Sequence, residues 1–228
     1  MAVNVGLMRR DAAMTNALLA CGVVGPPLFI ATFLLDGATR PGYNPWRNFV
    51  SQLSTGDRGF VQIANFIVLG TLALGFAAGL ARLRLTSIAI VQGVYGTAIL
   101  AAGIFVTDPG LGYPPGASQA QTTHGAVHGV AALAAFTSNA LACFVTAFVV
   151  RRDPRWQGWV GYSIVSGTLV LAIVGASSAI AQADEAGRIV NGPSGLVQRI
   201  SVVIGLVWLA AFSFRLRRTG APTATQRP

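Results

Sequence analysis

The residues best suited to chemistry lie in one stretch, TDPGLGYPPGASQAQTTHGAVHG, which covers residues 107–129. It contains both histidines of the chain, His124 and His128, and one aspartate, Asp108. Histidines four residues apart lie on the same face of a helix, and with a carboxylate they form a ligand set that zinc or non-haem iron uses. The stretch therefore predicts either a metal site or a hydrogen-bond network between the segments that flank it.

The predicted metal site lacks part of the motif of zinc hydrolases that bind zinc through two histidines of one helix. Those enzymes carry a glutamate beside the first histidine, whereas Gly125 follows His124 here. The chain also has no third histidine. We therefore favour the hydrogen-bond network and expect no cofactor, with zinc bound by Asp108, His124 and His128 as the alternative.

These residues are embedded in a chain with the composition of a membrane protein. The 228 residues are 53% hydrophobic and 10% charged, whereas soluble domains are roughly 25% charged. A helix of about 20 apolar residues crosses a bilayer, and six runs qualify. The predicted spans are residues 15–35, 60–81, 87–107, 124–150, 158–181 and 196–214. We expect an all-α, polytopic bundle of six transmembrane helices.

The arginines predict the direction of these spans, and every basic residue of the chain is an arginine. Arginines are in excess before the first span and after the second, fourth and sixth spans. The positive-inside rule then places both termini in the cytoplasm of a multi-pass protein of the cell (plasma) membrane. Because the arginines form short clusters between apolar runs, we expect contacts with membrane lipids and none with nucleic acid.

The domain organisation follows from the same pattern. We expect a cytoplasmic N-terminal segment over residues 1–14, a transmembrane domain over residues 15–214, and a basic, disordered tail over residues 215–228. Small residues at intervals of three and four, as in GTLALGFAAG and GVYGTAILAAG, predict close helix packing. Asn65 and Asn139 lie inside spans and are suited to hydrogen bonds between helices.

The long connections lie at the end opposite the termini, where polar residues gather. Asp108 ends the third span, Thr122 or Thr123 is suited to cap the fourth, and Arg199 begins the sixth. An arginine near hydrocarbon is costly, so it either faces a partner, binds a phosphate, or snorkels to the interface. We expect Asp108, His124 and Arg199 to form a polar pocket for a lipid headgroup or small anion.

The first long connection contains GYNPWRNFVSQLSTGDRG, in which NFVSQLS predicts a short amphipathic surface or re-entrant helix. Ser51 or Ser54 would cap that helix or line a pocket. A nucleophilic serine needs an activating base and an oxyanion hole, and no sequence feature links a histidine to either serine. Ser51 is therefore a candidate for ligand binding, and catalytic residues stay unassigned.

The order of these motifs resembles a bacterial and archaeal membrane family, domain of unknown function 998, over about residues 15–214. The resemblance rests on NFVSQLS after the first span, an aspartate before HG, and GLVQRI at the sixth span. It implies a six-span protein without an assigned activity. The matching positions are Ser51, Leu53, Asp108, His124, Gly125 and Arg199, while Gln52 stands where the family often has an acidic residue and His128 lies outside the pattern.

A looser likeness connects the chain to a seven-span hydrolase superfamily that includes alkaline ceramidases. Those enzymes resemble it in having a serine, an aspartate and His-x-x-x-His, but they have a third histidine and a seventh span. The leading interpretation is an integral membrane protein of unassigned activity with a polar pocket. The alternatives are a metal-dependent intramembrane lipid hydrolase and a small-solute transporter, although the span interiors hold almost no ionisable residues for coupling.

Overall fold

The computed structural model describes residues 2–222, with side chains from residue 10 onward, and all its long elements are helices. Six of them are long and apolar enough to cross a membrane, and two short 3-10 helices complete the chain. The elements are α1 Ala2–Thr39, η1 Val50–Ser54, α2 Gly59–Arg82, α3 Thr86–Ile104, α4 Thr123–Val150, η2 Pro154–Trp156, α5 Trp159–Glu185 and α6 Ser194–Thr219. Within residues 2–222 there is no strand, so the predicted six-span, all-α fold is confirmed.

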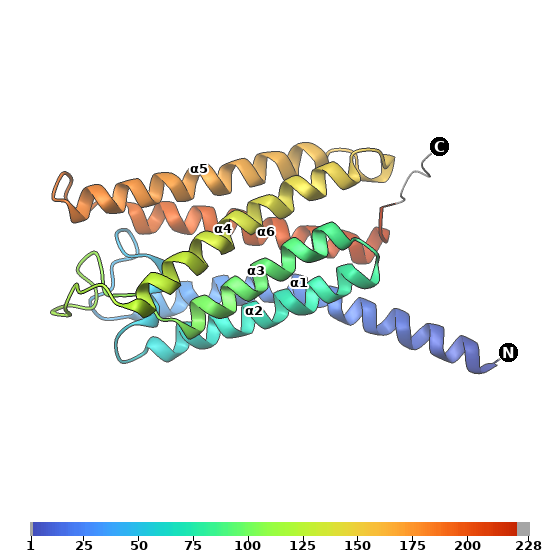
Figure 1. Ribbon diagram of the computed structural model, residues 1–228, viewed down its shortest axis with the longest axis horizontal. Coiled ribbons are helices and arrows are strands. Elements are labelled where there is room, and N and C mark those ends of the chain that lie inside the picture. Colours follow the sequence, from blue (N-terminus) through green and yellow to red (C-terminus); the bar gives the residue numbers. More distant parts are fainter. Residues whose placement is uncertain (1, 223–228) are drawn as a thin grey trace.

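The six helices form a closed ring whose members run along the long axis of the molecule (Figure 1). Each helix packs against the next helix in the chain, and α6 packs back against α1. The two neighbours of α5, which are α4 and α6, approach each other only sparsely inside the ring. The centre of the ring is therefore filled by side chains rather than by a further helix.

The two ends of the ring differ in the length of their connections (Figure 1). At the terminal end lie both chain termini and the short connections 83–85 and 151–158. At the loop end lie the three long connections, which we call loop one (residues 40–58), loop two (105–122) and loop three (186–193). The cytoplasmic location of the terminal end stays a prediction.

Helix bounds differ from the expected ones at α1, at α3 and in the tail. The first helix continues through Pro26 and Pro27, as transmembrane helices often do because neighbouring groups satisfy the freed carbonyls. The third helix ends at Ile104 because Phe105 adopts an extended backbone. The sixth helix extends through the first residues of the predicted tail to Thr219, and residues 223–228 lie outside the described part.

Close packing between α2 and α3 follows from the small residues in their sequences. A Cβ atom on Gly70 would lie 2.9 Å from the carbonyl oxygen of Gly96, and a Cβ on Gly96 would lie 3.0 Å from the backbone nitrogen of Leu74. Side chains at these positions would push the backbones apart. The predicted role of the small residues in helix packing is therefore confirmed for this pair.

Aromatic side chains fill the ring toward the terminal end. Trp208 and Phe212 stack with ring centroids 5.3 Å apart, and Trp156 of η2 packs on Phe212 at 5.8 Å. Phe76 of α2 meets the same Phe212 edge-on at 6.2 Å. Trp156, Trp208, Phe76 and Phe212 are all fully buried. This aromatic cluster closes the terminal half of the bundle.

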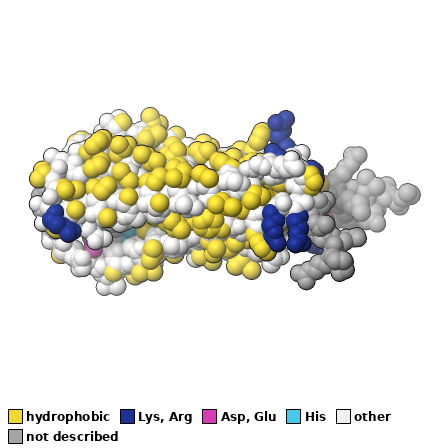
Figure 2. All heavy atoms as spheres, turned by 90° about the horizontal axis from the view of Figure 1, so that it is seen from above, with side chains coloured by type: hydrophobic (Ala, Val, Ile, Leu, Met, Phe, Trp, Pro, Cys, Tyr) yellow, Lys and Arg dark blue, Asp and Glu magenta, His cyan; other side chains and the backbone are white. Residues whose placement is uncertain are grey.

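The outer surface between the two ends is largely apolar, as Figure 2 shows for one face, with blue arginine side chains only near the ends. Many large apolar side chains are exposed along the helices, including Leu35, Phe60, Val130, Leu133 and Phe148. Water would disfavour such a surface, whereas hydrocarbon accommodates it. The chain is therefore a multi-pass membrane protein.

Arginines at the loop end are mostly paired with acidic groups inside the protein. Arg40 and Arg58 both contact Asp36, and Arg47 contacts Asp184. The described arginines of the terminal end are mostly exposed, and only Arg82 and Arg155 among them form ion pairs, with Asp11 and Asp153. Pairing thus increases the difference in free positive charge between the two ends, in the direction that the positive-inside prediction uses.

Candidate functional site

Asp108 lies at the start of α4, where it fixes the return of loop two. Its carboxylate accepts hydrogen bonds from the backbone nitrogen of Thr122 at 2.9 Å and from the Thr122 hydroxyl at 2.6 Å. The Thr122 side chain in turn accepts a hydrogen bond from the backbone of Gly125, so the predicted N-cap is confirmed at Thr122. A carboxylate at a helix N-terminus is also stabilised by the helix dipole.

A steric constraint explains why a glycine, Gly125, follows His124. A Cβ atom at Gly125 would lie 2.0 Å from an oxygen of the Asp108 carboxylate, which leaves room only for a hydrogen atom. Gly125 therefore lets the carboxylate approach the first turn of α4. Asp108, Thr122 and Gly125 form one cap structure, and this cap uses both carboxylate oxygens of Asp108.

The two histidines have different surroundings, although they lie on one helix. His124 is exposed, and its ring packs against Phe105 with centroids 5.4 Å apart. His128 is buried, and its Nδ1 lies 3.0 Å from the carbonyl oxygen of Ala102 and 2.8 Å from that of Phe105. Both partners are acceptors, so Nδ1 carries the proton and donates it to the end of α3. The predicted network between spans three and four is present and centres on His128.

A metal site has little support in the arrangement of these side chains. Within the part of the chain that the structure describes, no group of three or more His, Cys, Asp and Glu side chains is placed to hold a metal ion. The Nδ1 atom of His128 faces carbonyl groups, and Asp108 caps α4. Each of the three proposed zinc ligands thus has structural partners within the protein, and His124 and His128 both contact Phe105.

Arg199 is buried at the start of α6 and is held by loop one. Its Nη1 donates to the carbonyl oxygens of Pro45 at 2.6 Å and Asn48 at 2.9 Å, and its Nη2 donates to the Tyr43 hydroxyl. The Tyr43 hydroxyl donates to the carbonyl of Phe49 at 2.9 Å. Burial raises the pKa of Tyr43 to about 12, although the nearby Arg199 charge acts in the opposite direction. Tyr43 is therefore neutral near pH 7.

Among the described residues, no carboxylate lies within 4.0 Å of the Arg199 guanidinium. Its hydrogen-bond partners belong to loop one, whereas those of Asp108 belong to loop two and the start of α4. The expected joint pocket of Asp108, His124 and Arg199 is therefore not formed by the described contacts. Sequence placed these residues at one end of the bundle, but the chain path gives each its own partners.

Loop one is organised around a buried carboxylate, Asp36, at the end of α1. Arg40 and Arg58 both donate to Asp36. Arg40 also donates to the carbonyl oxygens of Leu53 at 3.1 Å and Thr55 at 3.2 Å. These bonds fold residues 40–58 back over the ring, and they explain why η1 is largely buried rather than lying on the membrane surface, which was one of its two expected placements.

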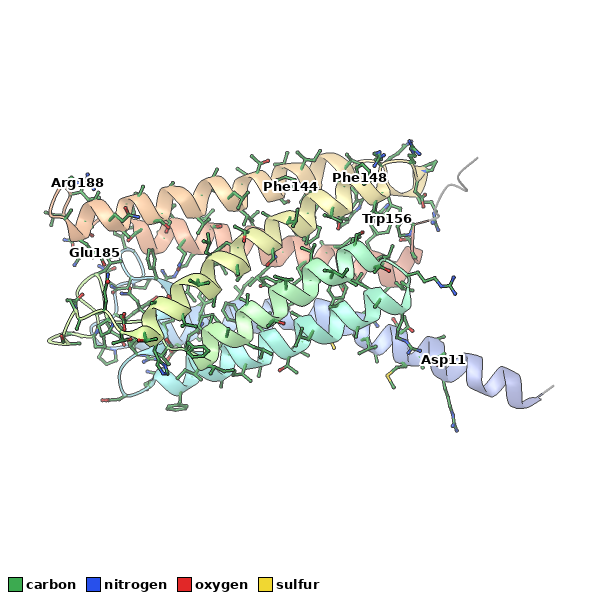
Figure 3. The ribbon with its side chains drawn as sticks, in the orientation of Figure 1. Asp11, Phe144, Phe148, Trp156, Glu185 and Arg188 are labelled. Carbon is green, nitrogen blue, oxygen red and sulfur yellow. The ribbon has the colours of Figure 1, made fainter. Side chains whose placement is uncertain are left out.

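Loop one also holds loop three. Arg47 forms a two-pronged ion pair with Asp184, with N···O distances of 2.7 and 2.9 Å. The indole nitrogen of Trp46 donates to the carbonyl of Asn191 at 3.0 Å, and Ser194 donates to the carbonyl of Arg47 at 2.7 Å. The exposed Glu185 and Arg188 lie at the same end (Figure 3). Loop three is thus held through Asn191 and through Asp184 and Ser194, which flank it.

Loop two is held by two amides of loop one. Gln52 donates to the carbonyl of Gly110 at 2.5 Å and accepts from the backbone nitrogen of Phe49 at 2.9 Å. Asn48 donates to the carbonyl of Leu111 at 3.1 Å. A carboxylate at position 52 could not donate to Gly110, so glutamine suits this chain. We call loops one, two and three, with η1, the loop cap.

A groove runs along the membrane-facing side of the loop cap, between α1 and α6. It has a volume of about 390 Å³ and is lined by Phe33, Leu34, Gly37, Ala38, Pro45, Trp46, Leu196 and Arg199. Leu34, Trp46 and Leu196 are exposed at its walls, whereas Arg199 is 7% exposed. Arg199 is therefore the one charged group in the lining of an otherwise apolar groove.

A second cavity lies inside the helix ring beneath the loop cap, with a volume of about 80 Å³. Its polar lining residues are Ser51, Tyr95, His128, Asn139, Gln198 and Ser201. Ser51 thus lines a pocket, as expected, and it shares this cavity with His128. Sequence reasoning missed Tyr43 and Tyr95, because a tyrosine in a loop or span is most simply explained by the membrane interface.

The two span asparagines have opposite outcomes. Asn65 donates from α2 to the carbonyl of Phe29 in α1 at 3.1 Å, as predicted. The prediction for Asn139 is wrong, because its buried Oδ1 has no hydrogen-bond partner in the part of the chain that is described. A polar residue in an apolar span signals that something must hydrogen-bond it, but sequence does not identify the partner.

Comparison with known proteins gives one match. No curated protein and no solved structure matches the chain. A family model described as "Protein of unknown function (DUF998)" matches residues 23–215. This range begins within α1 and ends within α6, so it includes the whole loop cap and most of the chain. The chain therefore belongs to the DUF998 family of proteins of unknown function.

Proposed function

We propose that this protein binds an anionic membrane phospholipid at the loop end, with the lipid phosphate held by Arg199 in the groove between α1 and α6. The observation that carries the proposal is the charge of Arg199, which is buried and has only neutral partners among the described residues. Burying an unpaired charge is costly, and an anion in the groove would offset that cost.

The guanidinium retains donors for such an anion. The Nε hydrogen and one Nη2 hydrogen of Arg199 have no partner among the described residues, whereas both Nη1 hydrogens are used by carbonyl groups. Two parallel N–H donors on one edge of a guanidinium match two phosphate oxygens. Tyr43 and the carbonyls of Pro45 and Asn48 then position the arginine for its ligand.

The walls of the groove favour a lipid over a free anion. Leu34, Ala38 and Leu196 line the groove beside Arg199 and are exposed on the outer surface of the bundle. An acyl chain there would cover apolar surface while the phosphate lies at the depth of Trp46, a residue type suited to the headgroup region. Asp108 and His124 have no role in this site.

The test uses substitutions at Ala38, which lines the groove without holding loop one. Ala38→Glu adds a carboxylate that competes for Arg199 and repels phosphate, and Ala38→Gln is the matched neutral control. The full-length protein is reconstituted with equal amounts of phosphatidylglycerol and phosphatidylcholine, and retained lipid is measured by native mass spectrometry. We expect the wild type and Ala38→Gln to retain phosphatidylglycerol preferentially. Ala38→Glu should retain roughly tenfold less phosphatidylglycerol, as expected for the loss of one ionic hydrogen-bonded contact.

Two outcomes would refute the proposal. One is equal retention of the two lipids by the wild type. Both lipids carry a phosphate, so equal retention would show that the protein does not select the lipid with the net negative headgroup. The other is undiminished phosphatidylglycerol on Ala38→Glu. Displacement of the lipid by millimolar inorganic phosphate would assign the site to a free anion instead.

A further inference from the structure

The cavity inside the helix ring has the lining of a ligand site that is separate from the groove. All six helices and η1 contribute to it, and most of its wall is apolar, from residues such as Phe29, Phe66, Leu69 and Val202. An ordered water needs about 10–15 Å³ of such space, and the cavity measures about 80 Å³. It therefore has room for a small polar group and several carbon atoms.

Three polar side chains in this lining have no hydrogen-bond partner among the described residues. They are Ser51 of η1, Tyr95 of α3 and Asn139 of α4, which converge on one cavity from different elements. Asn139 is 4% exposed and Tyr95 is 5% exposed, so bulk solvent does not satisfy them. The Oδ1 atom of Asn139 is fully enclosed and unpartnered. Buried polar groups are normally hydrogen-bonded, so this cluster favours an occupant that can hydrogen-bond.

The backbone of α6 makes room for the asparagine. A Cβ atom on Gly205 would lie 2.4 Å from Asn139 Oδ1, so any side chain at this position would displace the amide. The neighbouring Gln198 uses its Oε1 to accept from the backbone of Val50 at 2.8 Å, and His128 uses its Nδ1 for the end of α3. Gln198 and His128 are thus fixed by hydrogen bonds within the protein. Asn139 is held in place by packing, and its side-chain amide has no hydrogen-bond partner among the described residues.

We propose that this cavity binds a small neutral alcohol, whose hydroxyl group hydrogen-bonds Asn139 and Tyr95 while its short hydrocarbon chain contacts the apolar wall. A hydroxyl both donates and accepts, so it can accept from the amide nitrogen of Asn139 and donate to the Tyr95 phenol oxygen. No Asp, Glu, Lys or Arg lines the cavity, so a charged ligand would lose its hydration without compensation. The site does not involve Arg199, so either proposal can fail without the other.

The test uses a diazirine-bearing straight-chain butanol as a photoprobe on the full-length protein in nanodiscs, with the corresponding butane probe as its match. Labelled residues are identified by peptide mass spectrometry. We expect the alcohol probe to label cavity residues such as Tyr95 and Phe136, and the alkane probe to label them much less. Unlabelled butanol should compete for these sites, and butane at the same concentration should not.

Variants separate a ligand site from a structural role. Asn139→Leu removes the amide at similar volume and should reduce cavity labelling by roughly tenfold, as loss of one or two hydrogen bonds in an apolar site would. Thr137→Ala removes an exposed hydroxyl on the same helix and should leave labelling unchanged. Ala132→Phe narrows the cavity while leaving every polar group in place, and it should also reduce labelling.

The wild-type measurements decide the matter even if a variant unfolds. Equal labelling of the cavity by alcohol and alkane probes, or labelling confined to the outer surface, would overturn the proposal. A cavity filled only with water would give that second result. Undiminished labelling of a folded Asn139→Leu protein would also overturn it, because the hydroxyl would then have another partner.

Discussion

Arg199 lies where a charge is costly, and its neighbours lower that cost without neutralising it. The carbonyl groups of Pro45 and Asn48 and the hydroxyl of Tyr43 present partial negative charges, but none supplies an ion. Asp36 and Asp184, in contrast, form ion pairs with the other buried or half-buried arginines of the loop cap, with Asp36 shared by Arg40 and Arg58. Arg199 has no carboxylate partner among the described residues, so it is the arginine to which a ligand is most simply assigned.

Tyr43 gives the loop cap a dependence on alkaline pH. Its pKa of about 12 lies above the ordinary value of 10.0, mainly because of burial, so the folded state binds the proton more tightly than the unfolded state. Stability is then present below pH 10 and falls as the pH rises toward 12, by on the order of 2 kcal/mol for this group. Tyr43→Phe removes this contribution.

The measurement is thermal unfolding in detergent from pH 9 to 12 for the wild type and Tyr43→Phe. The wild type should be the more stable protein at pH 9, and its advantage should shrink as the pH rises. Parallel stability curves over that range would show that deprotonation of Tyr43 is not linked to folding.

The two histidines should differ in their effect on stability. His128→Ala removes a buried ring and leaves the carbonyls of Ala102 and Phe105 without their donor, which should lower the free energy of unfolding by about 2–4 kcal/mol. His124→Ala changes an exposed side chain and should alter it by less than about 0.5 kcal/mol. Equal effects in chemical unfolding, or a larger effect for His124, would contradict the assigned roles.

At the scale of single elements, the start of α4 depends on a carboxylate that fits against a glycine. Gly125→Ala places a methyl group where Asp108 now lies, so it should displace the cap and destabilise the protein by about 1–3 kcal/mol. Gly129→Ala is the matched control, because nothing lies within 4 Å of its Cβ position. It should be neutral or stabilising by up to about 1 kcal/mol.

Unfolding midpoints of the two variants, compared with wild type, check this prediction. Asp108→Ala combined with Gly125→Ala should recover part of the loss, since the clash is removed with the carboxylate. A Gly125→Ala protein as stable as Gly129→Ala would mean that Asp108 does not occupy the first turn of α4.

Elements were predictable from sequence where the signal is local. Span lengths follow from runs of apolar residues, the N-cap at Thr122 follows from its position before α4, and the α2–α3 packing follows from spaced glycines. The contacts of the loop cap were not predictable, because they join residues far apart in the chain. Arg47 and Asp184 are 137 positions apart, and Arg199 and Pro45 are 154 apart.

The candidate site shows the same limit at the level of residues. Asp108, His124 and Arg199 were chosen because they are polar and lie at one end, and sequence could not reveal that loop one lies over Arg199. Asn139 was recognised as a polar residue in an apolar span, and a hydrogen bond to another helix was predicted for it. Only the packed ring shows that its Oδ1 atom has no such partner among the described residues. Both differences arise from tertiary packing, on which the one-dimensional pattern carries no information.

At the scale of the whole molecule, the two ends of the ring are closed in different ways. The terminal end is closed by stacked aromatic side chains and carries most of the unpaired arginines. The loop end is closed by hydrogen-bonded loops, with the groove outside the ring and the cavity inside it. Both candidate sites therefore lie in the half of the bundle that the loops cover; the groove is proposed to bind a lipid phosphate and the cavity an alcohol.

An experimental structure of the protein in a bilayer containing phosphatidylglycerol tests most directly whether Arg199 holds a lipid phosphate. The predicted result is headgroup density between α1 and α6, with phosphate oxygens within hydrogen-bond distance of the Nε and Nη2 atoms of Arg199. Density for acyl chains alone, or an Arg199 side chain paired with a protein carboxylate in that structure, would contradict the claim.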